Sequence, residues 1–261
     1  MTHVARDLMK IAIEAATSAG RIIQDSWRDA HRVRIKSTST DPVTEVDERA
    51  ETQIRSVIAS HRPFDRVIGE EQGDSSGLSD IYWMVDPIDG TVNYIYGRDE
   101  VAVSIAALDI NGPVASCVYL PRFQRTFSAV RGEGAWLGKE PLKMSSPPQL
   151  SEALLGTGFS YHSAGRAEQM KKLSRVLPEV RDLRRSGSAA IDLCSLANGT
   201  LDVFIEDDLE EWDWAGASLI VLESGGSFLR FTSDRGTSGV VAGCTSLVRQ
   251  VLDLWTDPTN T

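Results

Sequence analysis

Five short runs between residues 65 and 130 are almost continuously apolar, and this pattern constrains the fold more than any other feature of the chain. A strand with one face in water alternates apolar and polar side chains, whereas a strand covered on both faces is apolar throughout. The runs therefore predict a sheet that is packed between other layers. Their ranges are 65–71, 81–86, 101–108, 113–120 and 125–130.

Two amphipathic helices are predicted before these strands. Apolar residues recur at helical spacing over residues 4–27, which predicts the first helix. The second helix is predicted to begin with Asp41 as its N-cap and Pro42 at its first helical position. Asp47 borders the apolar face of this helix, an unusual place for an unpaired charge. The alternative is that Asp47 lies at the edge of that face and still reaches water.

The second half of the chain again alternates helical and strand-like segments. Helices are predicted over 163–178 and 245–256, with another in "WDWAGASLIVLESGG" and a helix followed by a strand in "GSAAIDLCSLANGTLDVFIE". No internal repeat or low-complexity linker divides the chain. We therefore expect a layered α/β or α+β fold. It would form a single domain over residues 1–261, with two packed halves at approximately 1–149 and 150–261.

Composition argues against several classes of partner. The formal net charge of −10 disfavours binding of a nucleic-acid backbone by electrostatic attraction. No run of about 18 apolar residues occurs, so no membrane span is predicted. The N-terminal segment carries charges throughout and is typical of an amphipathic helix instead of a signal peptide. The three cysteines stand far apart in apolar contexts, which favours reduced core residues and a cytoplasmic location.

Two aspartates stand in the stretch "WMVDPIDGTVNY", residues 83–94, directly after an apolar run. Pro87 restricts Asp86 to an extended conformation and lacks an N–H, so the strand is predicted to end there. Asp89 follows past a bend, where its carboxylate can turn back toward Asp86. Two such carboxylates repel each other unless a cation lies between them, and their hard oxygen atoms suit Mg²⁺. A surface turn is the alternative, because Asp and Gly are common turn residues.

Further candidate ligands lie within this stretch and in distant parts of the chain. Gly90 and Thr91 follow at the expected start of a short helical turn, where backbone N–H groups can hold a phosphate group. Glu70, in "GEE", ends another apolar run, a position where α/β sheets collect ligands; a solvated loop is the alternative. Asp213 opens the helix in "WDWAGASLIVLESGG", and simple capping of that helix is its alternative role.

Together these stretches resemble the inositol monophosphatase family of Mg²⁺-dependent, lithium-sensitive phosphatases. The signatures appear here as "DPIDGTVNY", "GEE" and "WDWAGASLIVLESGG", and the resemblance extends to "TDPVTEVD" and "GSAAIDLC". They occur in the expected order and cover nearly the whole chain. The resemblance implies an α+β fold, a layered α/β/α/β/α sandwich, that usually forms a homodimer.

The resemblance also implies an Mg²⁺ site made of carboxylates and one carbonyl group. Glu70, Asp86 and the carbonyl of Ile88 would bind the first ion. Asp86, Asp89 and Asp213 would bind the second, and a third, weaker ion would reach Glu70 through waters. Two ions held in this way could neutralise a phosphate monoester and hold the attacking water in line with the leaving oxygen.

Other residues are implied to hold water and substrate. Thr91, supported by Asp47, and Glu70 would position the nucleophilic water. The backbone N–H groups of Gly90 and Thr91 would hold the phosphate group. Glu206 would contact hydroxyl groups of the substrate. The same pocket would be lined by Gly187, Ser188 and Ala189.

The activity implied is hydrolysis of a phosphate monoester, foremost myo-inositol monophosphate to myo-inositol and phosphate. Histidinol-phosphatase and fructose-1,6-bisphosphatase activities are alternatives, because those enzymes share the metal motifs. A bisphosphate substrate would require extra basic residues near the pocket, for which Arg184 and Arg185 are candidates. A regulatory protein-binding role on the same fold and a calcium-binding structural module are alternatives of other classes.

Two segments depart from the family pattern. Arg98, Asp99 and Glu100 follow the first signature, where the family often has an apolar or proline-containing stretch. These residues could face substrate, a dimer partner or water. Ser160, in "ALLGTGFSY", is the candidate for the serine that often helps to bind phosphate in this family.

Overall fold

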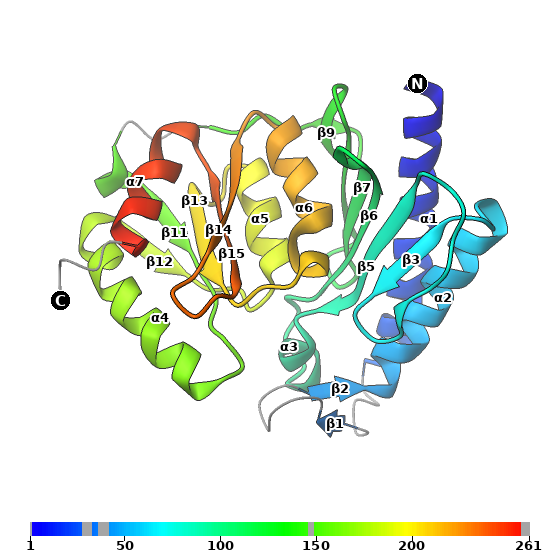
Figure 1. The fold of residues 1–261 in the computed structure, drawn as a ribbon, viewed down its shortest axis with the longest axis horizontal. Helices are drawn as coiled ribbons and strands as arrows, with labels where there is room; N and C mark the ends of the chain where they lie inside the picture. The colour runs from blue at the N-terminus through cyan, green and yellow to red at the C-terminus, as the bar shows by residue number, and fades with distance from the viewer. Residues whose placement is uncertain (1, 28–32, 36–41, 146–148, 257–261) are drawn as a thin grey trace.

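The computed structural model describes residues 2–27, 33–35, 42–145 and 149–256, and its elements form five layers (Figure 1). Helices α1 and α2 cover one face of a large sheet, α5 and α6 lie between the two sheets, and α4 and α7 cover the outer face of a smaller sheet. The predicted α/β/α/β/α sandwich is therefore confirmed. The helices are α1 (Thr2–Asp25), α2 (Glu45–His61), α3 (Thr91–Ile95), α4 (Ser163–Val176), α5 (Ala189–Ala197), α6 (Glu211–Glu223) and α7 (Thr245–Thr256).

The large sheet has eight strands in the order β10-β9-β8-β7-β6-β5-β3-β4. Strand β5 pairs in parallel with β3 and antiparallel with β6. The carboxyl ends of β3 and β5 therefore lie beside each other at the same end of the sheet. The strands are β3 (Arg66–Gly69), β4 (Gly73–Asp74), β5 (Tyr82–Asp89), β6 (Ala102–Asp109), β7 (Gly112–Leu120), β8 (Arg125–Val130), β9 (Gly134–Leu137) and β10 (Glu140–Pro141).

The smaller sheet has five strands in the order β12-β11-β13-β15-β14. Strand β11 runs parallel to both β12 and β13, so the segments that leave these three strands emerge at the same end of the sheet. A separate two-stranded ribbon pairs β1 (Val33–Ile35) with β2 (Pro42–Thr44). The strands of the smaller sheet are β11 (Leu154–Gly156), β12 (Asp182–Arg184), β13 (Val203–Asp207), β14 (Ser227–Thr232) and β15 (Ser238–Gly243).

One hydrophobic core connects the two sheets through the middle helices. Met84 and Phe127 of the large sheet belong to the same cluster of buried residues as Leu193 of α5, Ile220 of α6 and Phe204 of the smaller sheet. Because apolar side chains of both halves are removed from water together, the halves pack on a shared interior. The predicted division near residue 149 stays a prediction.

Most of the predicted segments match elements of the structure. The five apolar runs correspond to β3, β5, β6, β7 and β8, and β5 and β6 are almost wholly buried, as strands covered on both faces should be. The predicted helices over 4–27, 163–178 and 245–256 correspond to α1, α4 and α7. No helix among the described residues is both long enough and apolar enough to span a bilayer.

The predicted start of the second helix is wrong. Pro42 lies in β2, helix α2 begins at Glu45, and its N-cap is Thr44; Asp41 lies outside the described residues. The Thr44 hydroxyl accepts hydrogen bonds from the N–H groups of Val46 and Asp47, and Asp47 accepts one from the Thr44 N–H at 2.9 Å. This reciprocal capping box satisfies more of the helix's first N–H groups than a cap at Asp41 could, since β2 pairing already extends to Thr44.

A buried ion pair joins α4 to the end of β13. Lys172 Nζ lies 2.7 Å from Asp207 Oδ2, and both side chains are almost fully buried. Gln169 Nε2 donates to Asp207 Oδ1 at 2.7 Å, and Trp255 Nε1 donates to Asp207 Oδ2 at 3.3 Å. Gln169 also accepts a hydrogen bond from the Ser160 N–H at 2.7 Å. The network therefore ties α4, α7 and β13 to the loop that follows β11.

Substitution of Lys172 by Met should lower the free energy of unfolding by about 3–5 kcal/mol, because it leaves the Asp207 carboxylate buried without its cation. Lys171 provides a matched control: its ammonium pairs with Glu168 at 2.9 Å on the surface, and Lys171→Met should cost less than about 1 kcal/mol. Urea unfolding of both variants measures the difference. Equal losses for the two variants would contradict the importance of the buried pair.

Candidate active site

Strand β5 carries two aspartates across an irregularity in its pairing with β6. Asp86 lies opposite Ser104 and Asp89 opposite Ala102, so β5 uses one residue more than β6 over this interval. Side chains alternate between faces along a strand, and one extra residue brings positions three apart back to the same face. Pro87, which cannot donate to a ladder, lies within this bulge. The prediction that the strand ends at Asp86 is wrong, since β5 continues to Asp89.

The turn after β5 requires a glycine. Gly90 has φ of 100°, in the left-handed region, and forms the N-cap of α3. A Cβ atom at this position would lie 2.9 Å from the backbone oxygen of Glu100, which leaves no room for a side chain. The turn places Thr91 Oγ1 3.0 Å from Ile88 O and 3.1 Å from Asp47 Oδ1. Thr91 and Asp47 are therefore in contact, as the family resemblance implied.

Asp47 is fully buried, so the alternative that it reaches water is wrong. Burial raises its pKa from 3.8 to about 6, although hydrogen bonds from the side chain and backbone of Thr44 act in the opposite direction. Repulsion from Glu70 adds to the upward shift. Asp47 therefore connects the cap of α2 to Thr91, and its pKa depends on the charge of the neighbouring Glu70.

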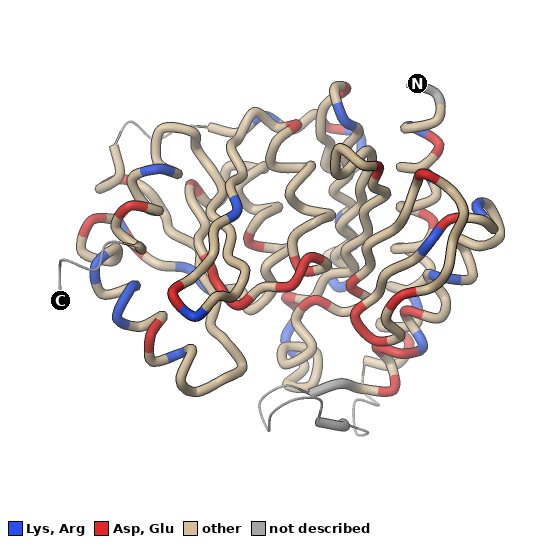
Figure 2. Tube along the Cα trace, viewed as in Figure 1, with Lys and Arg blue, Asp and Glu red and all other residues tan. Residues whose placement is uncertain are grey.

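Four buried or partly buried carboxylates converge at the ends of β3 and β5 and the start of α6: those of Glu70, Asp86, Asp89 and Asp213. Burial raises the pKa of Asp86 and of Asp213 well above the usual range, and repulsion from the other carboxylates raises both further. Burial also raises the pKa of Asp89 to about 6. Figure 2 shows acidic residues at the start of α6 and at the neighbouring ends of the large-sheet strands, near the middle of this view. The electrostatic field at this point is therefore strongly negative.

Backbone and hydroxyl donors hold three of these aspartates in place. Asp86 Oδ1 accepts from the N–H of Ile88 at 3.0 Å, and Asp213 Oδ2 accepts from the N–H of Glu210 at 2.7 Å. Asp89 Oδ2 accepts from the Ser188 hydroxyl at 2.7 Å and the Ala190 N–H at 2.6 Å. Each of these bonds uses a single carboxylate oxygen, so the chain orients the carboxylates without using their full capacity.

The donor set fits a divalent cation by its chemistry. Several hard oxygen ligands lie together, and their mutual repulsion would be relieved by a positive charge among them. Among the described residues, no group of three or more His, Cys, Asp or Glu side chains is itself arranged as a finished metal site. A hydrogen bond between Glu70 and Asp86 raises the pKa of Asp86 as well. Glu70, Asp86, Asp89 and Asp213 are the residues that could hold such an ion.

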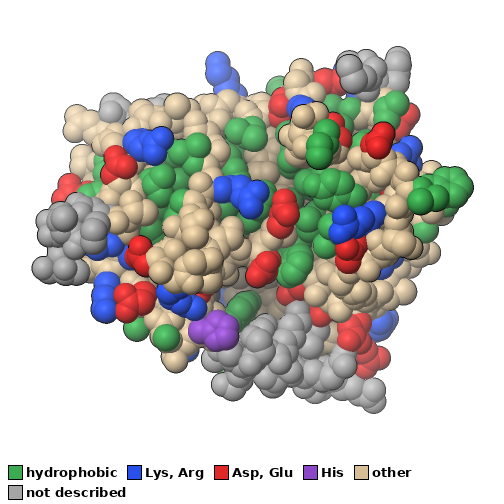
Figure 3. All heavy atoms as spheres, in the orientation of Figure 1, with side chains coloured by type: hydrophobic (Ala, Val, Ile, Leu, Met, Phe, Trp, Pro, Cys, Tyr) green, Lys and Arg blue, Asp and Glu red, His purple; other side chains and the backbone are tan. Residues whose placement is uncertain are grey.

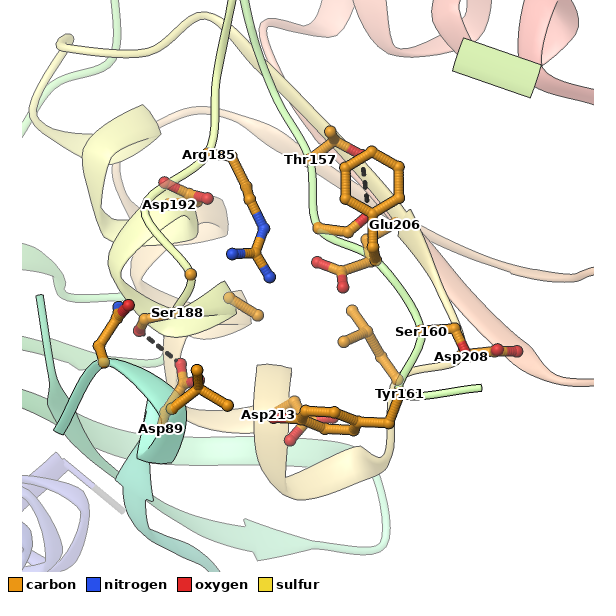
Figure 4. A pocket seen from close by; sticks show the side chains of 17 residues that line it. Asp89, Thr157, Ser160, Tyr161, Arg185, Ser188, Asp192, Glu206, Asp208 and Asp213 are labelled. Carbon is orange, nitrogen blue, oxygen red and sulfur yellow. Dashed lines mark hydrogen bonds between the residues drawn. The ribbon is translucent and has the colours of Figure 1, made fainter. Parts of the chain in front are cut away.

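A cavity of about 120 Å³ adjoins this cluster, several times the ~10–15 Å³ that one water requires. Asp89 and Asp213 line one side of it, and Glu206, Asp192 and Arg185 line the other (Figure 4). Gly187, Ser188 and Ala189 also line it, as the resemblance implied. Burial raises the pKa of Glu206 well above its ordinary value, and repulsion from Asp213 and Asp192 adds to this.

A second, larger cavity of about 610 Å³ lies beside the first and is lined by Glu70, Asp213 and Ser160 among others. Figure 3 shows a hollow in the lower middle of the same face, with acidic side chains near its rim. Ser160 lines both cavities, and its hydroxyl accepts from the His162 N–H at 3.0 Å. Residues of the carboxylate cluster thus line both the smaller and the larger cavity.

One polar residue of the smaller cavity, Asp192, was not identified from the sequence, and only one of the two basic candidates lines the cavity. Asp192 of α5 is buried in the cavity wall, and burial raises its pKa to about 7, although Ser186 donates to it. A single aspartate within the apolar helix "AAIDLCSLA" was a usable signal, of the same kind as that at Asp47. Of the two basic candidates, Arg185 lines the cavity, whereas Arg184 pairs with Asp182 at 2.7 Å on the surface.

The segment that departs from the family pattern, Arg98 to Glu100, lies against the Gly90 turn. Glu100 accepts a hydrogen bond at its backbone oxygen from Asn93 Nδ2 at 2.7 Å. Its side chain pairs with Arg98 at 3.2 Å, and Asp99 pairs with Arg122 at 2.8 Å. None of Arg98, Asp99 and Glu100 is among the residues that line the two cavities described above.

Fold and site together define a class: layered α+β proteins that gather several buried carboxylates beside a small polar cavity. The model of the inositol monophosphatase family matches residues 5–252, and the chain belongs to this family. The resemblance inferred from the sequence signatures is therefore confirmed.

Relatives of known name cover most of the chain. It is 45% identical over 202 residues to an "Inositol-1-monophosphatase" of Mycobacterium leprae, covering 74% of this chain and 69% of the relative. It is 35% identical over 256 residues to a "Nus factor SuhB" of Haemophilus influenzae, covering 94% of each. The crystal structure of the extragenic suppressor protein suhB from Bartonella henselae superposes with a TM-score of 0.88 at 30% identity, covering 97% of this chain and 99% of that one.

Titration of Asp47 should leave a measurable trace in the stability of the metal-free protein. Its pKa rises from 3.8 to about 6 on folding, so the folded chain binds this proton more tightly. The resulting stabilisation is complete below pH 3.8 and is lost as the pH rises through about 6. Urea unfolding in EDTA should therefore show the wild type losing about 2–2.5 kcal/mol relative to Asp47→Asn between pH 4 and 7. A difference that stays constant over this range would contradict the assignment.

Proposed function

We propose that the chain hydrolyses a phosphate monoester with the aid of Mg²⁺, and that its substrate is a myo-inositol monophosphate, released as myo-inositol and phosphate. The observation that carries the proposal is the cluster of Glu70, Asp86, Asp89 and Asp213 with Glu206 on the opposite side of the adjoining cavity. Membership of the inositol monophosphatase family and the name of the Mycobacterium leprae relative support it.

The residues that would hold two or three Mg²⁺ ions are the acidic cluster and one backbone oxygen: Glu70, Asp86, the carbonyl of Ile88, Asp89 and Asp213. When bound, such ions neutralise the charge of the phosphate group and lower the pKa of a bound water. The chain contributes the orientation of the carboxylates, through Ser188 and the N–H groups of Ile88, Ala190 and Glu210.

The chain's own groups for handling the water would be Thr91, Asp47 and Glu70. Thr91 donates its hydroxyl proton to an acceptor such as Asp47, so an oxygen lone pair remains to accept a hydrogen bond from the attacking water. The backbone N–H groups of Gly90 and Thr91, at the start of α3, would hold the phosphate oxygens.

The alcohol part of the substrate would lie in the smaller cavity. Glu206 lines this cavity together with Gly187, Ser188 and Ala189, so its carboxyl group can contact substrate hydroxyls. The positive φ of 91° at Gly187 brings the backbone close to Asn93, since a Cβ atom there would lie 2.9 Å from Asn93 Nδ2. This close approach joins the Gly90 turn to the start of α5 and so sets the width of the cavity.

Asp86→Asn and Asp213→Asn should each reduce phosphate release from inositol 1-phosphate at least about 10²-fold, because each removes one negative charge from the cation site. Asp253→Asn, on the exposed side of α7, is the control and should keep wild-type turnover. EDTA should abolish activity, Mg²⁺ should restore it, and Ca²⁺ and Li⁺ should inhibit. Near-wild-type activity in either metal-site variant would overturn the assignment.

A second candidate is a regulatory protein-binding role on the same fold, favoured by the name of the Haemophilus influenzae relative. The same variants separate the two functions, since a protein-binding role would survive Asp86→Asn. Histidinol phosphate and fructose 1,6-bisphosphate remain alternative substrates, and a preference of tenfold or more for either would overturn the inositol assignment. We further propose a cytoplasmic homodimer, which light scattering of the purified chain would test.

A further inference from the structure

Arg185 extends into the smaller cavity between two buried carboxyl groups, those of Asp192 and Glu206 (Figure 4). Its charge lowers the pKa of both of these groups, against the larger effect of their burial. Within the described residues, however, its guanidinium group forms neither a hydrogen bond nor an ion pair. A guanidinium carries five N–H donors in a fixed plane, so all of them remain available to a ligand in the cavity.

The strand preceding Arg185 explains why this arginine reaches the cavity and its neighbour does not. Successive side chains along an extended segment point to opposite sides. Arg184 ends β12, at the edge of the smaller sheet, and its guanidinium donates to Asp182 and to the Leu183 carbonyl at 2.7 and 2.8 Å. Arg185 follows directly and lies on the cavity side. The chain therefore supplies two adjacent arginines, one already paired and one not.

The charges around this part of the cavity select among alcohols. Asp192 and Glu206 accept hydrogen bonds, whereas Arg185 only donates them, so a hydroxyl group can satisfy either kind of partner. A second phosphate group would gain Arg185 but would be repelled by the two carboxyl groups. An ammonium group would gain the carboxyl groups but would be repelled by the guanidinium cation, by about 1–4 kcal/mol at a separation of about 4 Å, toward the lower value where the exposed Arg185 is screened by water.

We infer that Arg185 is the specificity-determining residue that makes this site select the phosphate ester of a neutral polyhydroxyl alcohol over the ester of an amino alcohol. The inference rests on the proposed phosphatase function and adds the class of alcohol. Arg185 binds hydroxyl oxygens of the leaving alcohol and excludes a cationic substituent, while Asp192 and Glu206 receive the hydroxyl protons.

Paired kinetics on inositol 1-phosphate and histidinol phosphate, with Mg²⁺, test this role. Arg185→Gln should raise KM for inositol 1-phosphate about tenfold or more, the effect of losing charge-assisted hydrogen bonds. Its kcat should change much less, because the carboxylate cluster is untouched. The same variant should use histidinol phosphate better, so that the ratio of kcat/KM for the two esters moves by at least about 10²-fold toward the amino alcohol.

Two further variants test whether the effect depends on the position of Arg185 and on its positive charge. Arg184→Gln removes the neighbouring arginine and should leave the ratio of the two esters within about twofold of wild type, since Arg184 is paired on the surface. Arg185→Lys keeps the positive charge, and its ratio should lie closer to that of wild type than to that of Arg185→Gln.

The possible results distinguish this inference from the proposed function. If the wild type hydrolyses inositol 1-phosphate and Arg185→Gln leaves the ratio unchanged, the inference is wrong and the proposed function stands. The inference is wrong as well if Arg184→Gln shifts the ratio as far as Arg185→Gln does. It is also wrong if Arg185→Lys shifts the ratio as far as Arg185→Gln does. If the wild type releases no phosphate from any ester in the presence of Mg²⁺, the proposed function and the inference fail together.

Discussion

The repulsion among buried carboxylates at the end of β5 is the constraint on which the rest of this structure depends. Removing a charged carboxylate from water costs several kcal/mol, and neighbouring charges of the same sign increase that cost. The raised pKa values of Asp86, Asp89 and Asp213 express this cost directly. The fold must therefore compensate for it elsewhere. A large shared core between two sheets, with helices on every remaining face, provides that compensation.

The chain reduces the cost locally by directing helix N-termini toward the acidic site. Asp47 and Asp213 each form part of a capping box at the start of a helix, α2 and α6 respectively. Asp89 accepts from the N–H of Ala190 in the first turn of α5, and Asp192 lies in that turn as well. The positive end of each helix dipole then faces negative charge, and otherwise unpaired N–H groups gain partners. Three separate helices thus stabilise one cluster, which explains why ligands so distant in sequence can meet.

Local sequence patterns predicted the buried strands and most helices, and the family resemblance supplied the order of the layers and the set of acidic residues, but neither predicted register or pairing. Apolar runs predicted the buried strands because two-sided burial leaves a continuous local signal. The start of α2 was mispredicted because Asp41-Pro42 and Thr44 offer competing caps, and pairing of β2 with β1 decides between them. Continuation of β5 past Pro87 depends on a bulge against β6, and a bulge is a property of two strands together. Likewise, which of Arg184 and Arg185 faces the cavity depends on how β12 is placed in the smaller sheet, and no local pattern gives that placement.

The site divides into two parts that depend on different features of the chain. The acidic cluster is set by backbone geometry: a bulge, a glycine with positive φ and three helix starts, none of which tolerates change easily. The far wall of the cavity is set by individual side chains: Arg185 in the segment after β12, Asp192 of α5 and Glu206 of β13. Replacing one of these side chains changes the charge at the cavity wall without moving the cluster. The proposed choice of alcohol therefore depends on this wall of the cavity, whereas the proposed phosphate chemistry depends on the acidic cluster, and the two can vary independently within one scaffold.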